Sequence, residues 1–122
     1  EKKVYLCTMN VYEELVGYLL PQEIFESFEV VKTTSEKVRD EEILHIFLEE
    51  RNRPPQASVP LRPNGFSEES QMQDFPIRDR KVILHLRKRR WKDAEGNSYS
   101  NDWQLVAKGT RMTNTFAAFL KE

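Results

Sequence analysis

Cysteine is nearly absent from this chain, in which Cys7 is the only example among 122 residues. A single cysteine cannot form an internal disulfide, and it excludes a zinc site built from several cysteines. Long hydrophobic runs are missing too, because no apolar stretch approaches the ~20 residues that a membrane-spanning helix needs. We also find no signal-peptide pattern. These absences favour a cytoplasmic protein without a membrane partner.

Glycine and histidine are scarce as well, with four and two residues. The glycines form no phosphate-binding loop, and no serine lies in the context of a nucleophile elbow. His45 and His85 lie among apolar residues in predicted strands, so we interpret them as sheet histidines rather than as metal ligands or bases. The sequence predicts no catalytic residue, no metal site and no cofactor, and we expect that the chain is not an enzyme.

Charge is strongly separated along the chain, although the net charge is only −1. Residues 10–50 contain eleven acidic residues against three basic ones, a net charge of −8. Residues 78–92 contain eight basic residues and one acidic residue, a net charge of +7. A basic pole of this kind attracts a polyanion. The alternative is that the two poles pair within the fold or across a homodimer.

Helices are predicted near both ends of the chain. Residues 10–28 form a helical segment that breaks at Leu20-Pro21, and a second short helix starts at Pro21. Residues 113–121 form a C-terminal helix that Thr113 or Asn114 can cap. The residues expected to form the apolar seam of the first helix are Val11, Leu15, Tyr18 and Leu19.

Strands are predicted between the helices. Residues 28–50 contain two acidic strands, which a turn from Ser35 to Glu41 separates. The segment 53–66 contains four prolines, so we expect a long extended loop that cannot join a sheet. Residues 71–106 form a basic β-hairpin region, in which one long strand over Arg80–Lys92 returns through a turn at Asp93–Asn97.

These elements together predict the fold class. A chain of this length suits a single domain over residues 1–122 with a modest core. We predict an α+β fold, with a mainly antiparallel sheet of about four strands, two N-terminal helices and one C-terminal helix.

The strongest indication of function is the run from Arg87 to Lys92. It contains five cations and one tryptophan, and it directly follows an apolar strand. A hairpin that closes at Glu95-Gly96 would place Trp91 near Tyr99 and Arg87 near Trp103. Arginine and aromatic side chains would then alternate across the hairpin. They would form either a platform for phosphates and bases or an internal set of cation–π contacts. The candidate DNA-binding residues are Arg87, Lys88, Arg89, Arg90, Trp91, Lys92, Trp103 and Arg111.

Four segments of the chain resemble one protein family. They are Gln73–Arg78 (QDFPIR), Lys81–Trp91 (KVILHLRKRRW), Asp102–Thr113 (DWQLVAKGTRMT) and Phe116–Leu120 (FAAFL). They are similar to the N-terminal, non-catalytic region of certain bacterial insertion-sequence transposases. A more distant likeness joins Leu86–Trp91 and Arg111-Met112-Thr113 to the zinc ribbons of other transposases. In that likeness Asp93–Asn97 occupies the place of the cysteine knuckle and brings no cysteine.

The resemblance implies a role in transposition and DNA recombination. The chain would bind the terminal repeats of the transposon, while a separate catalytic subunit with a DDE nuclease fold would cut and join the DNA. The alternative is a protein-protein interaction domain that docks the catalytic transposase subunit and makes no direct DNA contact. The zinc site of the more distant likeness is lost, so packing has to hold the hairpin.

Overall fold

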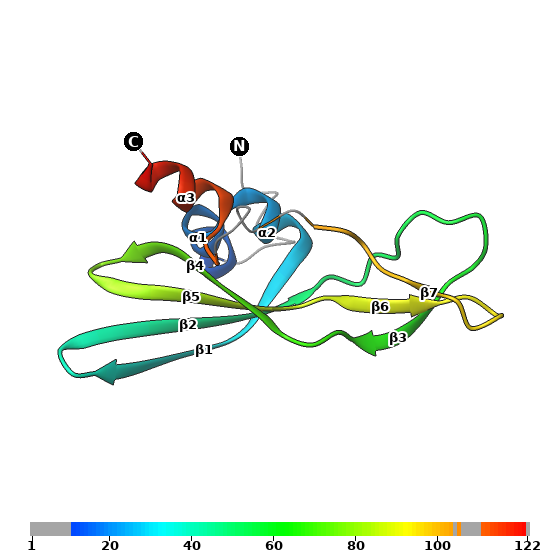
Figure 1. Cartoon of the computed structure of the whole chain (residues 1–122), viewed down its shortest axis with the longest axis horizontal. Helices are drawn as coiled ribbons and strands as arrows, with labels where there is room; N and C mark the ends of the chain where they lie inside the picture. The colour runs from blue at the N-terminus through cyan, green and yellow to red at the C-terminus, as the bar shows by residue number, and fades with distance from the viewer. Residues whose placement is uncertain (1–10, 104, 106–110, 122) are drawn as a thin grey trace.

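Two sheets and three helices make up the computed structural model, which describes residues 11–103, 105 and 111–121. The predicted α+β class is confirmed. Figure 1 shows the helices and the larger sheet at one end of an elongated molecule, and the smaller sheet at the other. Cys7, residue 10 where the first helical segment was predicted to begin, and residue 106 where the hairpin region was predicted to end lie outside the described residues. No described helix is long and apolar enough to cross a membrane.

The larger sheet has the order β1-β2-β5-β4. Its strands are β1 (Phe28–Val38), β2 (Glu41–Glu50), β5 (Arg80–Arg87) and β4 (Ser70–Ile77). β1 with β2 and β4 with β5 are antiparallel hairpins, and β2 pairs with β5 in parallel. Four strands and mainly antiparallel pairing were predicted, whereas the parallel pair in the centre was not.

Two-residue connections close both hairpins. β1 continues to Val38, which pairs with Glu41, so the turn predicted within Ser35–Glu41 is present but is confined to Arg39 and Asp40. Side chains in residues 35–38 alternate along an exposed edge strand, and their polarity alone does not distinguish a strand from a turn. Between β4 and β5, Arg78 and Asp79 both have positive φ, as a tight hairpin turn requires.

The hydrophobic core lies between the larger sheet and the helices. Inward-facing residues alternate along β2 and β5, which is the pattern that predicted these strands. The helical contribution comes from Leu20 and from Ile24 of α2 (Gln22–Ser27). The buried cluster contains Leu20, Ile24, Phe28, Ile46, Leu48, Met72, Val82, Leu84, Leu86 and Leu105.

The first helix, α1 (Val11–Leu19), turns a different face to the protein than its spacing predicted. All four residues expected in its apolar seam are exposed. The helix instead approaches α2 through Gly17, where an added Cβ would lie 3.0 Å from the Phe25 ring. Glycine suits this contact, because a larger residue would require the Phe25 ring to shift by a few tenths of an ångström.

The smaller sheet has the order β3-β6-β7, with β3 (Arg62–Phe66), β6 (Arg89–Lys92) and β7 (Ser98–Tyr99). The expectation that all of 53–66 forms a loop was wrong, because β3 pairs with β6 despite Pro63. An edge strand tolerates a proline because its outer side needs no donor. The single strand predicted over Arg80–Lys92 is divided at Lys88, and the returning strand ends at Tyr99.

The C-terminal helix, α3 (Asn114–Leu120), is attached to the outer edge of β4. Gln73 donates its backbone N–H to Arg111 at 2.7 Å and accepts one from Thr113 at 2.9 Å. The Thr113 hydroxyl accepts from the Phe116 N–H at 3.4 Å, which confirms the predicted cap. The same hydroxyl donates to the buried Asp74 carboxylate at 2.8 Å.

Asp74 makes stability depend on pH. Burial raises the pKa of this carboxyl, and hydrogen bonds from Thr113 and from the Phe75 backbone offset only part of the effect. A carboxyl with a higher pKa in the folded state destabilises the fold as it ionises. We therefore expect Asp74→Asn to gain stability over the wild type as pH rises above about 4. Thermal unfolding over a pH series measures this, and a constant difference between the two proteins would contradict it.

Candidate nucleic-acid interface

The basic run from Arg87 to Lys92 passes from one sheet into the other. β5 ends at Arg87 and β6 begins at Arg89. The carbonyl of Lys88, between them, accepts a hydrogen bond from the Ser67 N–H at 2.8 Å. The chain thus keeps an extended course across the junction, and neighbouring cations point in different directions.

Two of the arginines, Arg87 and Arg89, have partners within the chain. The guanidinium carbon of Arg87 lies 4.4 Å from the centroid of the Phe66 ring, and that of Arg89 lies 4.9 Å from it. Arg87 also forms an ion pair with Glu49, while the Nε of Arg89 donates to the Glu50 carbonyl at 2.8 Å. These contacts match the internal cation–π alternative. Their aromatic partner is Phe66, which the sequence did not indicate because this residue lies in the segment predicted to be a loop.

Both tryptophans are engaged within the fold, Trp91 by burial and Trp103 by contacts with Phe28 and Glu50. Trp91 pairs with Tyr99 as predicted, but it is only 3% exposed. Trp103 lies beyond the end of β7, packs against Phe28 at 5.9 Å between ring centroids, and donates its indole N–H to Glu50 at 3.2 Å. The strand pairing that was expected to bring Trp103 opposite Arg87 is absent, because the paired part of β6 and β7 ends at Trp91 and Tyr99.

Glu50 connects the two sheets and was missed by the sequence analysis. Its carboxylate, 2% exposed, accepts hydrogen bonds from the Arg89 backbone N–H at 2.8 Å, from Asn101 at 2.8 Å and from Trp103 at 3.2 Å. The alternation along β2 indicates that Glu50 is buried, because this residue continues the inward-facing series of Ile46 and Leu48. An acidic residue at an inward position requires donors from elsewhere in the chain.

Asp93 stabilises the turn that follows β6. Its carboxylate accepts from the N–H groups of Glu95 and Asn97 at 2.9 Å each, from the Asn97 side chain at 3.1 Å and from Tyr99 at 3.2 Å. Burial raises the pKa of Asp93, but these donors outweigh it and the pKa is lowered. Hydrogen bonds thus hold the turn at Asp93–Asn97 in place. Within the described ranges, no group of three or more His, Cys, Asp or Glu residues could hold a metal ion.

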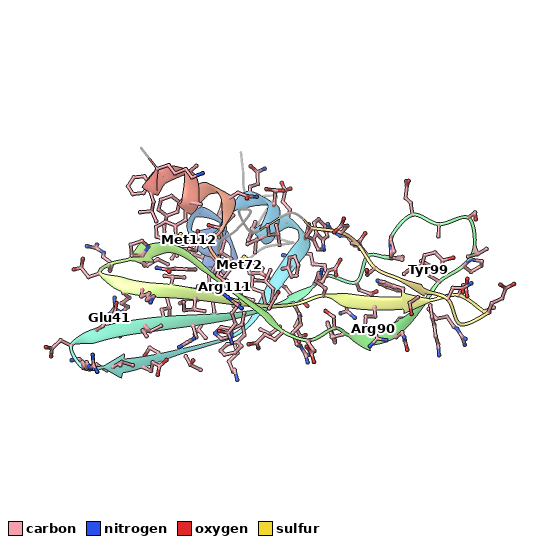
Figure 2. The ribbon with its side chains drawn as sticks, viewed as in Figure 1. Glu41, Met72, Arg90, Tyr99, Arg111 and Met112 are labelled. Carbon is pink, nitrogen blue, oxygen red and sulfur yellow. The ribbon has the colours of Figure 1, made fainter. Side chains whose placement is uncertain are left out.

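Three other cations share one face of the smaller sheet. Arg62 pairs directly with Lys92 across β3 and β6, and Arg90 lies two residues before Lys92 on the same strand. By strand alternation all three point away from the Trp91 side. Figure 2 shows Arg90 and Tyr99 on opposite sides of this sheet. None of the three side chains has a hydrogen-bond or ion-pair partner among the described residues. We call Arg62, Arg90 and Lys92 the cationic face.

The two remaining candidates lie outside the cationic face. The half-buried Lys88 lines a small pocket with residues that include Phe28, Met72 and Trp103. Arg111 is exposed beside β4, and Figure 2 places it at the larger sheet, away from Arg90. The cationic face contains two of the eight predicted residues, Arg90 and Lys92, together with Arg62.

No family model, curated protein or solved structure matches this chain. The likeness to transposase regions therefore stays a prediction, and function has to be argued from the geometry of the chain itself.

Glu50 offers a direct test of how the smaller sheet is held. We expect Glu50→Ala to lower the free energy of unfolding by about 1.5–3 kcal/mol, because buried donors lose a charged acceptor. The control is Glu49→Ala at the adjacent position, which removes a partly exposed ion pair and should cost about 1 kcal/mol or less. Urea denaturation measures both variants, and equal losses would show that Glu50 does not have this role.

Proposed function

We propose that this chain is a non-catalytic nucleic-acid-binding module, the DNA-binding accessory region of an insertion-sequence transposase. The observation that carries the proposal is the cationic face, where three cations share one surface with no described partner. Arg87 and Arg89 carry the same charge but are engaged by Glu49, Glu50 and Phe66. The difference matters because binding to a polyanion is driven by cations that replace its counterions.

The mechanism is electrostatic capture of the phosphate backbone. Long arginine and lysine side chains on paired strands reach several phosphates, and a sheet of this width presents them together. Stacking on bases contributes little, because Trp91 is buried and the partly buried Trp103 packs against Phe28. Such an interface positions the protein on DNA with little dependence on sequence. Recognition of transposon ends would then depend on the catalytic subunit, which would also cut and join the DNA.

The cationic face makes a quantitative prediction. If three phosphates are neutralised on duplex DNA, log K against log salt concentration has a slope of about −2.7. The combined variant Arg62→Gln, Arg90→Gln, Lys92→Gln should lose most of the affinity and most of the slope. Fluorescence anisotropy of labelled duplex and single-stranded DNA at several salt concentrations measures both quantities.

A control variant removes three positive charges at other positions of the chain. Lys37→Gln, Lys81→Gln, Lys121→Gln changes three cations outside the smaller sheet and leaves the cationic face intact. We expect it to retain the slope and to lose affinity only weakly, through the long-range field. Equal losses of DNA affinity in the two variants would show that binding depends on total charge and not on the cationic face. No DNA binding at low salt would contradict the DNA-binding proposal.

A second candidate function is docking to the catalytic transposase subunit, and one observation favours it. α1 exposes Val11, Tyr12, Leu15, Tyr18 and Leu19, with exposed fractions from 46% to 79%. Exposed apolar patches of this kind are typical of protein interfaces.

The two candidates respond to different changes. We expect Leu15→Glu, Tyr18→Glu to abolish binding to the catalytic subunit in a pull-down and to leave DNA affinity unchanged, since charge disrupts an apolar contact. The cationic-face variant should show the reverse. If the α1 variant binds the subunit as well as the wild type does, docking through this helix is wrong.

A further inference from the structure

The only two histidines of the chain meet on the larger sheet, on the side opposite the helices. His45 and Phe47 of β2 face away from Ile46 and Leu48, and His85 of β5 lies beside them. The Nδ1 of His45 is 2.7 Å from the Nε2 of His85. Both nitrogens are thus within hydrogen-bond distance of each other, although they lie on strands that are 40 residues apart in the chain.

Each histidine has a carboxylate on its other nitrogen. The Nε2 of His45 is 2.7 Å from Glu36 of β1, and the Nδ1 of His85 is 2.7 Å from Glu69, which precedes β4. Glu36, His45, His85 and Glu69 therefore form one continuous row, which we call the Glu–His–His–Glu chain. It crosses the larger sheet from the β1 edge to the start of β4.

Counting protons shows what this row requires. Three hydrogen bonds need three protons, one in each gap. Two neutral imidazoles bring one proton each, and two carboxylates bring none. If the imidazole protons point to the carboxylates, two lone pairs face each other across the central gap of 2.7 Å. The observed geometry therefore needs one more proton than the neutral side chains supply.

The surroundings favour keeping the extra proton between the two rings. The hydrogen bond from His85 lowers the pKa of Glu69, with further lowering by Gln71 and by the charges of His85 and Arg87, so this carboxylate stays ionised. The Phe47 ring stacks on His85 at 4.2 Å between centroids, and the His85 side chain is only 7% exposed. The other charged groups on this face are Lys32 over Phe47, and Glu49 paired with Arg87.

A metal ion fits the central gap less well than a proton does. Two nitrogens that bind one tetrahedral zinc at about 2.0–2.1 Å lie about 3.3–3.4 Å apart. The central distance of 2.7 Å is that of a hydrogen bond instead.

We propose that a single proton taken from solvent bridges His45 and His85, and that the resulting three-proton chain ties the strands of the larger sheet together in a pH-dependent way. Loss of this proton leaves two facing lone pairs, and a fourth proton leaves two facing N–H donors. Both changes break the central contact. The fold is therefore most stable when the chain holds three protons.

The sign of the pH dependence follows from proton linkage. Only the folded chain brings the two rings together, so only the folded chain has a site that binds the third proton between them. Stability therefore falls as pH rises through the release of that proton. At acidic pH the unfolded chain binds both imidazole protons and the folded chain resists the fourth, so stability falls as pH decreases.

Nitrogen-15 NMR of the imidazole rings tests the proton count directly, because all histidine signals come from His45 and His85. At neutral pH, we expect three of the four ring nitrogens to bear a proton, one for each hydrogen bond of the row. Two protonated nitrogens, one per ring, with independent titrations would overturn the proposal. Displacement of the third proton by added zinc ions, with both rings shifting, would overturn it in favour of a metal site.

Stability measurements test the consequence. As the third proton is released, the logarithm of the folding constant should fall by up to about one per pH unit in the wild type. His45→Gln should remove this dependence, because an amide can donate to a neutral His85 without an extra proton. Lys37→Gln, an exposed position on the same sheet, should keep it. If His45→Gln and the wild type have parallel pH profiles, the proposal is wrong.

Discussion

The position of the smaller sheet depends on one buried carboxylate. Glu50 ends β2, and its oxygens accept hydrogen bonds from the first residue of β6 and from Asn101 and Trp103. A buried carboxylate is tolerated only with several donors, so the geometry of all three partners is constrained together. The chain leaves the larger sheet after Arg87 at this contact, and the direction of β6 follows from it. Arg90 and Lys92 of the cationic face lie beyond this junction, and Arg62 pairs with Lys92.

The junction also explains why a run of similar cations has two different roles. Arg87 and Arg89 flank Phe66 at the point where the sheets join, and their charge is neutralised or used in hydrogen bonds there. Arg90 and Lys92 lie past the junction on the opposite face, where Arg62 of β3 joins them. Part of the positively charged run therefore stabilises the fold. Only the cations without partners in the fold keep their charge available for a ligand.

The larger sheet separates apolar from titratable groups in a similar way. Its helix-covered face contains the buried cluster, whereas the other face contains the Glu–His–His–Glu chain with Phe47 and Lys32 beside it. Alternation along β2 and β5 places both sets on the same strands. Because the apolar face holds the strands together, the polar face can contain groups whose contacts depend on protonation. The β1 edge is mostly exposed, so the row of hydrogen bonds ends where solvent begins.

The sequence by itself determined the local features. Alternation identified β2 and β5, Thr113 was recognised as a helix cap, and the turn after Lys92 was expected from its residues. These follow from interactions within a few residues. Only the tertiary structure decided that Pro63 joins a strand, that α1 turns its apolar side outward, that Phe66 replaces a tryptophan beside the arginines, and that the two histidines meet. Each of these depends on pairing between strands or helices far apart in the chain, and periodicity contains no information about which distant segment becomes the neighbour.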